Sequence, residues 1–80
     1  MTAQLSDLLL NDRGFVFDPV SGETFQLNTT GLRIMRMLQQ GLDADAATAR
    51  ILDEFEVEEN TARRDVEDFL HALGQLGWKP

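Results

Sequence analysis

The spacing of the apolar residues changes once along this chain, at Asn28. No other feature of the sequence restricts the possible folds as strongly as this change. Before it, short segments rich in aromatic and β-branched residues are typical of strands. After it, apolar residues recur every three or four positions, as on the buried face of a helix. Strands followed by helices within 80 residues predict one α+β domain, residues 1–80, with the helices on one face of a small sheet.

Two or three short antiparallel strands are predicted before Asn28, separated by two turns. The predicted strands are Leu5–Leu10, for which a loose N-terminal arm is the alternative, Phe15–Asp18 and Glu23–Leu27. The turns, Asn11–Gly14 and Asp18–Gly22, contain the Asn, Asp, Pro and Gly residues that favour tight turns. In the last strand, Phe25 and Leu27 share one face, which we expect to pack on the core.

Three helices are predicted after the strands. Their ranges are from Asn28 (or Thr29 or Thr30) to Gly41, from about Asp43 or Asp45 to Phe55, and from about Glu58 to Leu76. Asn28 suits an N-cap position, and Gly41 and Gly77 are typical helix stops. Gly31, in the first turn, indicates close packing against the sheet. Trp78 is expected to fold back on the core.

Residue types that carry most catalytic and metal chemistry are missing or isolated. The chain has no cysteine and a single histidine, His71, which excludes a thiolate zinc site and makes a metal site improbable. The acidic run Asp53–Asn60 lacks the central glycine of a calcium loop and indicates a solvated helix junction. A chain this short also has little room for a deep cleft. We therefore predict no enzyme activity, no metal and no cofactor.

The net charge of −7 is concentrated in the second half of the chain. Residues 43–80 carry ten acidic and four basic side chains, a balance that repels phosphate backbones and anionic membranes. No apolar run approaches the roughly 20 residues that span a bilayer, and no signal peptide is recognisable. We therefore predict a cytoplasmic protein with no nucleic-acid and no membrane partner.

Two surfaces are candidate binding sites. An edge at Glu23–Leu27 would expose main-chain N–H and C=O groups that can accept an extended peptide as an extra strand, although many edges bind nothing. On the third helix, a helical wheel places Arg63, Glu67 and Leu70 on one flank. Arg63 could meet an acidic group of a peptide there. Alternatively, Arg63 and Glu67 are only a surface ion pair one turn apart.

Two motifs carry a resemblance to a known family. The first, G-x-x-F-x-L-N-x-T-G-x-x-I-x-x-x-L, runs from Gly22 to Leu38, and the second, R-D-V-x-x-F-L-x-x-L, from Arg64 to Leu73. Through them the chain resembles, from about Leu10 to Trp78, the PqqD-like family of peptide-binding modules, also called RiPP recognition elements. The stretch "FVFDPVSGETFQLN" is also similar to a branch found beside an HPr-kinase-like protein.

The resemblance implies a winged-helix-like fold with a three-stranded antiparallel sheet followed by three helices. It implies a non-catalytic module that captures the leader of a ribosomally made precursor peptide by strand addition, between the third strand and the third helix. The module would present the peptide to a modifying enzyme, a radical SAM or an HPr-kinase-like protein. The predicted peptide-binding residues are Thr24, Phe25, Gln26 and Leu27 on the strand, with Arg63, Glu67 and Leu70 added from the helical wheel.

Two alternatives stay open. A winged-helix DNA-binding or transcription-regulatory protein would have a similar order of helices, but a DNA reader should carry a basic stripe. The third helix instead combines five acidic residues with Arg63 and Arg64. A dimerisation module, in which two sheet edges pair, is the other alternative. We expect a monomer or a weak homodimer.

Overall fold

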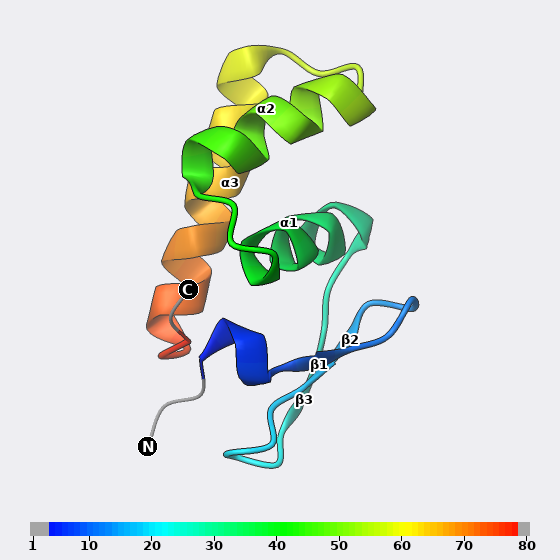
Figure 1. Ribbon diagram of the computed structural model, residues 1–80, viewed down its shortest axis with the longest axis vertical. Helices are drawn as coiled ribbons and strands as arrows, with labels where there is room; N and C mark the ends of the chain where they lie inside the picture. The colour runs from blue at the N-terminus through cyan, green and yellow to red at the C-terminus, as the bar shows by residue number, and fades with distance from the viewer. Residues whose placement is uncertain (1–3, 79–80) are drawn as a thin grey trace.

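The computed structural model describes residues 4–78 and shows a small sheet with helices stacked on one side of it (Figure 1). Residues 1–3 and 79–80 of the predicted domain lie outside the described part. The elements are a 3₁₀ helix η1 (Leu5–Asp7), strands β1 (Leu9–Leu10), β2 (Phe15–Phe17) and β3 (Thr24–Gln26), and helices α1 (Thr29–Gln39), α2 (Ala44–Glu54) and α3 (Glu59–Gln75). Three strands followed by three helices confirm the predicted α+β class.

The first predicted strand, Leu5–Leu10, is wrong over its first half. Leu5–Asp7 forms one 3₁₀ turn, closed by a hydrogen bond of 2.9 Å from the Asp7 N–H to the Gln4 carbonyl. Leu5 and Leu8 are both buried, and a spacing of three suits a helical turn better than a strand, which would turn them to opposite faces. Only Leu9–Leu10 remains to pair with β2.

The sheet is antiparallel in the order β1-β2-β3, so β3 lies at an edge. Val16 faces Phe25 across the β2–β3 pair and is fully buried. Beyond the strand ends, the Leu27 N–H donates to the Gly14 carbonyl at 2.8 Å. Gly14 has φ of +90°, and a Cβ there would lie 2.4 Å from the Leu27 carbonyl oxygen, so only glycine fits. The turn before β2 therefore fixes the end of β3.

Helix α1 starts after the predicted capping residue: Asn28 Oδ1 accepts the Gly31 N–H at 2.7 Å. At the start of α2, Asp43 Oδ1 accepts the Ala46 N–H at 2.8 Å. Helices α1 and α3 end just before Gly41 and Gly77, as predicted. The buried apolar core comprises Leu5, Leu8, Val16, Ile34, Met35, Met37, Leu38, Ala47, Ile51, Ala62, Val66, Leu73 and Trp78.

Trp78 folds back on the core, as predicted, and is only 4% exposed. Its Nε1–H donates to Asp18 Oδ2 at 3.1 Å, and its ring meets Phe25 edge-on with centroids 5.0 Å apart. The same Asp18 carboxylate accepts the N–H groups of Val20 and Ser21 in the β2–β3 turn. The end of the chain is thereby fastened behind β3, on the side of the sheet that packs on the core.

In Figure 1, α1 lies between the sheet and α2, and α3 runs along one side from the level of α2 toward the sheet. Helices α2 and α3 pack against each other, and α1 contacts both. Within the described residues, every helix is too short or too polar to cross a membrane. The open edge of β3 and the flank of α3 nearest the start of α1 are therefore the parts of the fold to compare with the predicted site.

Candidate functional site: the edge of β3 and the adjoining groove

The main-chain groups of Thr24 and Gln26 point to the open side of β3. Residues of an antiparallel strand alternate between bonding one neighbour and facing away from it. Glu23 and Leu27 both bond toward β2, through Asp18 and Gly14 respectively. By alternation Phe25 bonds inward too, and the N–H and C=O of Thr24 and Gln26 face outward. The predicted strand edge is therefore open, and these two residues supply its outward donors and acceptors.

The side chains of β3 alternate between the two faces of the sheet. Thr24 and Gln26 are exposed on the outer face of the sheet, while Phe25 is half-buried and packs on the core. Leu27, just after the strand, is also half-buried against the core. The apolar residues hold the strand in place, and its open edge is left free for a partner.

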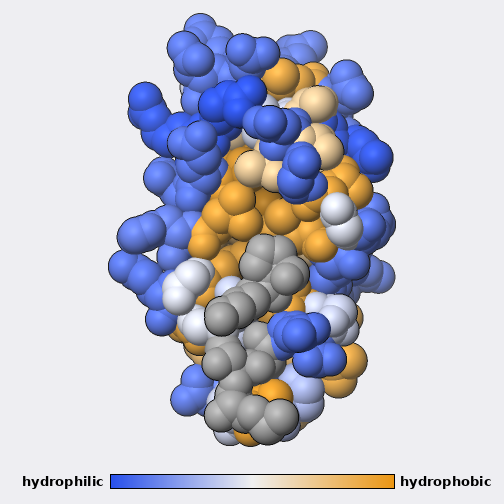
Figure 2. Space-filling model, turned by 60° about the vertical axis from the view of Figure 1, so that its left-hand side comes forward, coloured by the Kyte–Doolittle hydropathy of each residue, from blue (hydrophilic) through white to orange (hydrophobic). Residues whose placement is uncertain are grey.

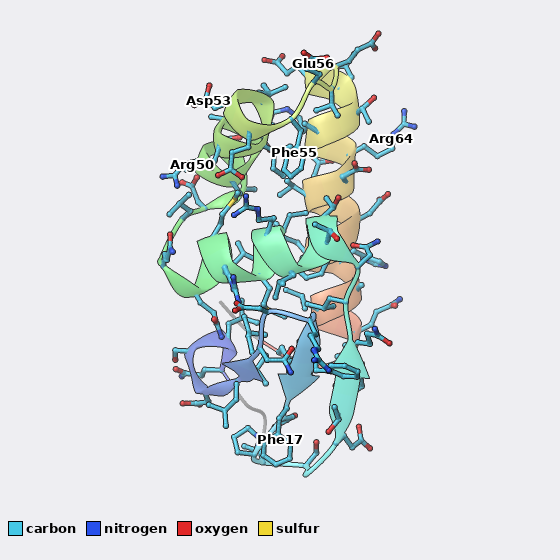
Figure 3. All side chains as sticks on the ribbon, turned by 90° about the vertical axis from the view of Figure 1, so that its right-hand side faces the viewer. Phe17, Arg50, Asp53, Phe55, Glu56 and Arg64 are labelled. Atoms are coloured by element: carbon cyan, nitrogen blue, oxygen red, sulfur yellow. The ribbon has the colours of Figure 1, made fainter. Side chains whose placement is uncertain are left out.

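A groove adjoins the end of β3, which we call the edge groove. It has a volume of about 340 Å³ and is lined by Asn28, Thr30, Gly31, Ile34, Asp65, Asp68 and Phe69. Its walls are the first turns of α1 and one flank of α3, and no Cα atom of β3 comes within 8 Å of a Cα atom of α3. Figure 3 shows the chain rising from β3 into α1 on this side of the molecule. The edge groove begins at Asn28, two residues after the end of β3.

Gly31 brings α1 close to α3 at the bottom of the edge groove. A Cβ at this position would lie 3.4 Å from Phe69 Cε2 and 3.1 Å from Asn28 Oδ1. The predicted close packing is thus found, but its main partners are α3 and the helix cap, with only Leu27 Cβ nearby from the strand side, at 3.5 Å. A larger residue here would push Phe69 outward and narrow the groove.

The structure does not bring the predicted helix residues to β3. Arg63 Nη1 lies 2.8 Å from Asp45 Oδ1 of α2, and this carboxylate raises the pKa of Arg63 above its ordinary value. Leu70 lines a separate hollow of about 310 Å³ beside the α1–α2 connection. Glu67 is exposed and lies one turn from Arg63 on the same flank. All three belong to the side of α3 that faces α2 and its entry loop.

Figure 2 shows an apolar area in the middle of one face, surrounded by hydrophilic residues. The hollow beside the α1–α2 connection is also largely apolar, because four of its lining residues have aliphatic side chains. They are Leu38, Leu42, Ala44 and Leu70. This hollow and the edge groove occupy opposite flanks of α3. Leu70 lines the hollow, and it lies about 100° around the helix from Phe69 and more than 100° from Asp65, which line the groove.

Sequence reasoning missed the lining of the edge groove, although a signal for it was present. Six of its seven residues are fixed letters of the two motifs. They are Asn28, Thr30, Gly31 and Ile34 in the first, with Asp65 and Phe69 in the second. The two motifs thus meet in space, and their meeting place marks the candidate site.

His71 is exposed, and its Nε2 lies 3.3 Å from Gln75 Nε2. Across residues 4–78, no three His, Asp or Glu side chains are grouped closely enough to hold a metal ion. The arrangement at β3 instead combines main-chain donors and acceptors, a partly apolar groove and two carboxylates. Such a surface suits an extended peptide.

Comparison with known proteins finds similar structures and a matching family. Two solved structures are similar over 85% of this chain: TbiB1 in complex with the TbiA(beta) leader peptide (29% identity, TM-score 0.75, 80% of that chain covered), and lasso peptide synthetase B1 complexed with the leader peptide (33% identity, TM-score 0.70, 81% covered). No curated protein matches the sequence. The family model of Coenzyme PQQ synthesis protein D (PqqD) matches residues 13–78, and the chain therefore belongs to the PqqD family.

Proposed function

We propose that this protein captures the leader of a ribosomally made precursor peptide and presents it to a modifying enzyme. The observation that carries the proposal is the free edge of β3, whose outward main-chain groups belong to Thr24 and Gln26. Both similar structures are complexes with a leader peptide, which supports the same use of the fold here. The chemistry is binding by strand addition, and the proposal includes no catalytic step.

In the proposed complex the leader extends the sheet beyond β3. Two N–H donors and two C=O acceptors, from Thr24 and Gln26, give main-chain pairing that does not depend on the peptide sequence. Alternate peptide side chains then face the inner side of the sheet, where the edge groove begins at Asn28. Phe25 and Leu27 contribute by holding the strand on the core. Specificity comes from the side chains that enter the groove.

For the α3 side of the site we propose Asp65, Asp68 and Phe69. These residues line the edge groove together with the first turn of α1. Arg63 is already paired with Asp45 of α2, on the other flank of the helix. We therefore assign the flank of Arg63, Glu67 and Leu70 no direct contact with the leader.

The modifying enzyme remains the least defined partner. We predict a radical SAM protein, or, for the branch beside an HPr-kinase-like protein, that protein. Co-purification with the neighbouring gene products would test this prediction. The DNA-binding alternative has less support, because the exposed face of α3 around the groove carries Asp65 and Asp68.

The test is an NMR titration of the ¹⁵N-labelled protein with synthetic leader segments of small peptides encoded by its neighbouring genes. We expect the largest shift changes at residues 24–27 and 65–69. Gln26→Pro should weaken binding about fivefold or more, because an unmade main-chain hydrogen bond costs roughly 1–3 kcal/mol. Gln26→Ala keeps the N–H and should bind within about twofold of the parent, since it loses only an exposed side chain.

Thermal melting of both variants shows whether the proline has damaged the fold itself. A second probe avoids that concern, because it changes the peptide: methylating its main-chain nitrogens one at a time should weaken binding at every second position. Equal affinity of the two Gln26 variants, or shift changes confined to the α2 side of α3, would contradict the proposed mode.

A further inference from the structure

The edge groove combines an apolar surface with two carboxylates on the same helix. Ile34 is 1% exposed and Phe69 is half-buried, and both line the groove. Asp65, Asp68 and Phe69 are spaced i, i+3 and i+4, which places the three side chains on one side of α3. A side chain in the groove therefore meets the exposed part of the Phe69 ring, with a pair of carboxylates beside it.

Neither carboxylate is neutralised within the described part of the chain. The three ion pairs between residues 4 and 78 join Arg33 to Glu54, Arg36 to Asp12 and Arg63 to Asp45. The groove lining contains no lysine or arginine. Arg64, one turn before Asp68, projects away from the body of the molecule in Figure 3. Asp65 and Asp68 also repel each other across one helical turn, so a cation between them would relieve that repulsion.

We propose that the residue of the bound peptide that enters the edge groove is a lysine or an arginine. Its aliphatic stem would lie on the exposed part of Phe69, with the buried Ile34 beneath, while its charged end meets the carboxylates of Asp65 and Asp68. The proposal rests on the proposed function, because it names the peptide chemistry that the same site selects. Asn28, two residues after Gln26, lines the groove, so the selected residue would follow or precede the peptide segment paired with Gln26 by a short distance.

Other side chains fit the groove less well. An acidic side chain would be repelled by both aspartates, since like charges at close range disfavour binding. A purely apolar side chain would cover the ring of Phe69 but would also shield the two carboxylates from water without giving them a partner. A long cationic side chain satisfies both parts of the lining. The groove volume of about 340 Å³ leaves room for such a chain at the surface.

The test is selection from a displayed library of random 12-residue peptides on the immobilised protein. We expect enriched peptides to share one position occupied by Lys or Arg, at a fixed distance from the segment that pairs with β3. Selection on Asp65→Asn/Asp68→Asn should lose this enrichment, and selection on Asp65→Lys/Asp68→Lys should replace it with Asp or Glu. Glu67→Gln removes an exposed carboxylate from the other flank of α3 and is the matched control, which should keep the basic position.

Affinities of one selected peptide make the test quantitative. Each Asp→Asn change should weaken binding by about two- to fivefold, as expected for a partly exposed ion pair. Raising the salt concentration from 0.05 to 0.5 M should weaken binding to the parent protein more than to the double Asn variant, because salt screens the ion pairs. Melting temperatures of all variants confirm that they are folded.

The outcomes separate the two proposals. Peptides that depend on the Gln26 N–H but have no basic position overturn this inference and leave the proposed function standing. A basic position that persists in the double Asn variant, or that Glu67→Gln also removes, overturns it as well. If no peptide is enriched, or if enriched peptides bind Gln26→Pro and Gln26→Ala equally, the strand-addition function fails and this inference fails with it.

Discussion

The same substitution at two turn glycines should have different costs, because their surroundings differ. Gly14 and Gly22 both have positive φ, +90° and +79°. At Gly14 a Cβ would lie 2.4 Å from the Leu27 carbonyl oxygen, whereas at Gly22 it would meet nothing within 4 Å. Gly22→Ala therefore introduces only backbone strain, and Gly14→Ala introduces strain and a clash that the backbone must move to relieve.

The magnitudes follow from these two terms. A left-handed backbone costs an L-residue roughly 1–2 kcal/mol, which is the whole expected effect of Gly22→Ala. In Gly14→Ala the backbone shift also breaks the 2.8 Å bond from the Leu27 N–H to the Gly14 carbonyl. That bond contributes about 0.5–1.5 kcal/mol net, so Gly14→Ala should cost about 1.5–3.5 kcal/mol in total. A domain of this size has only about 4–12 kcal/mol of stability, so the loss is substantial.

Urea unfolding followed by the fluorescence of Trp78 measures both effects. With a slope of about 1 kcal/mol per M, the midpoint of Gly14→Ala should lie about 0.5–1.5 M below that of Gly22→Ala. Gly74→Ala is the internal control: Gly74 is exposed within α3 with nothing near its Cβ position, and the change should stabilise the protein by about 0.5–1 kcal/mol. Equal midpoints for the two turn variants would refute the argument that the clash fixes the end of β3.

Three further predictions concern charge. Burial acts to raise the pKa of Asp18, but hydrogen bonds from Trp78, Val20 and Ser21 outweigh burial and leave the pKa below its usual value. The carboxylate therefore stabilises the fold fully above about pH 3.9, and this stabilisation is lost as the pH falls further. Urea midpoints measured from about pH 2.5 to 6 should show the loss, and Asp18→Asn should make the midpoints less dependent on pH. Arg63→Gln should change peptide affinity less than about twofold by calorimetry, because Arg63 pairs with Asp45 away from β3. Duplex DNA should show no salt-dependent binding in fluorescence anisotropy, and a measurable salt slope would restore the DNA-binding alternative.

Local features of this chain could be predicted from sequence because each is determined within a few residues. Asn28 caps α1 through the N–H three positions ahead, and the Asp18–Gly22 turn is held by the Asp18 side chain bonding its own neighbours. The apolar segment Leu5–Leu10 was mispredicted for the opposite reason. A short apolar run fits a strand or a helical turn equally well. Burial of both Leu5 and Leu8 in the core, with η1 against α1, decides between them.

The side of α3 that faces β3 could not be predicted in this way. A helical wheel groups residues relative to the buried stripe of Ala62, Val66 and Leu73, but this stripe has two flanks, and the wheel does not distinguish them. Packing of α3 on α2 makes the distinction. The ion pair between Arg63 and Asp45, 18 residues apart in sequence, lies on the flank toward α2.

Because the Arg63 flank of α3 packs toward α2, the opposite flank of α3 faces the start of α1. It carries Asp65, Asp68 and Phe69 and contributes no arginine to the groove. The folded chain thus uses the cation of one flank to join two helices and leaves two carboxylates in the edge groove. The consequence is a reversal of the expected electrostatics: Arg63 would have selected an acidic peptide, whereas the flank that lines the groove selects a basic one.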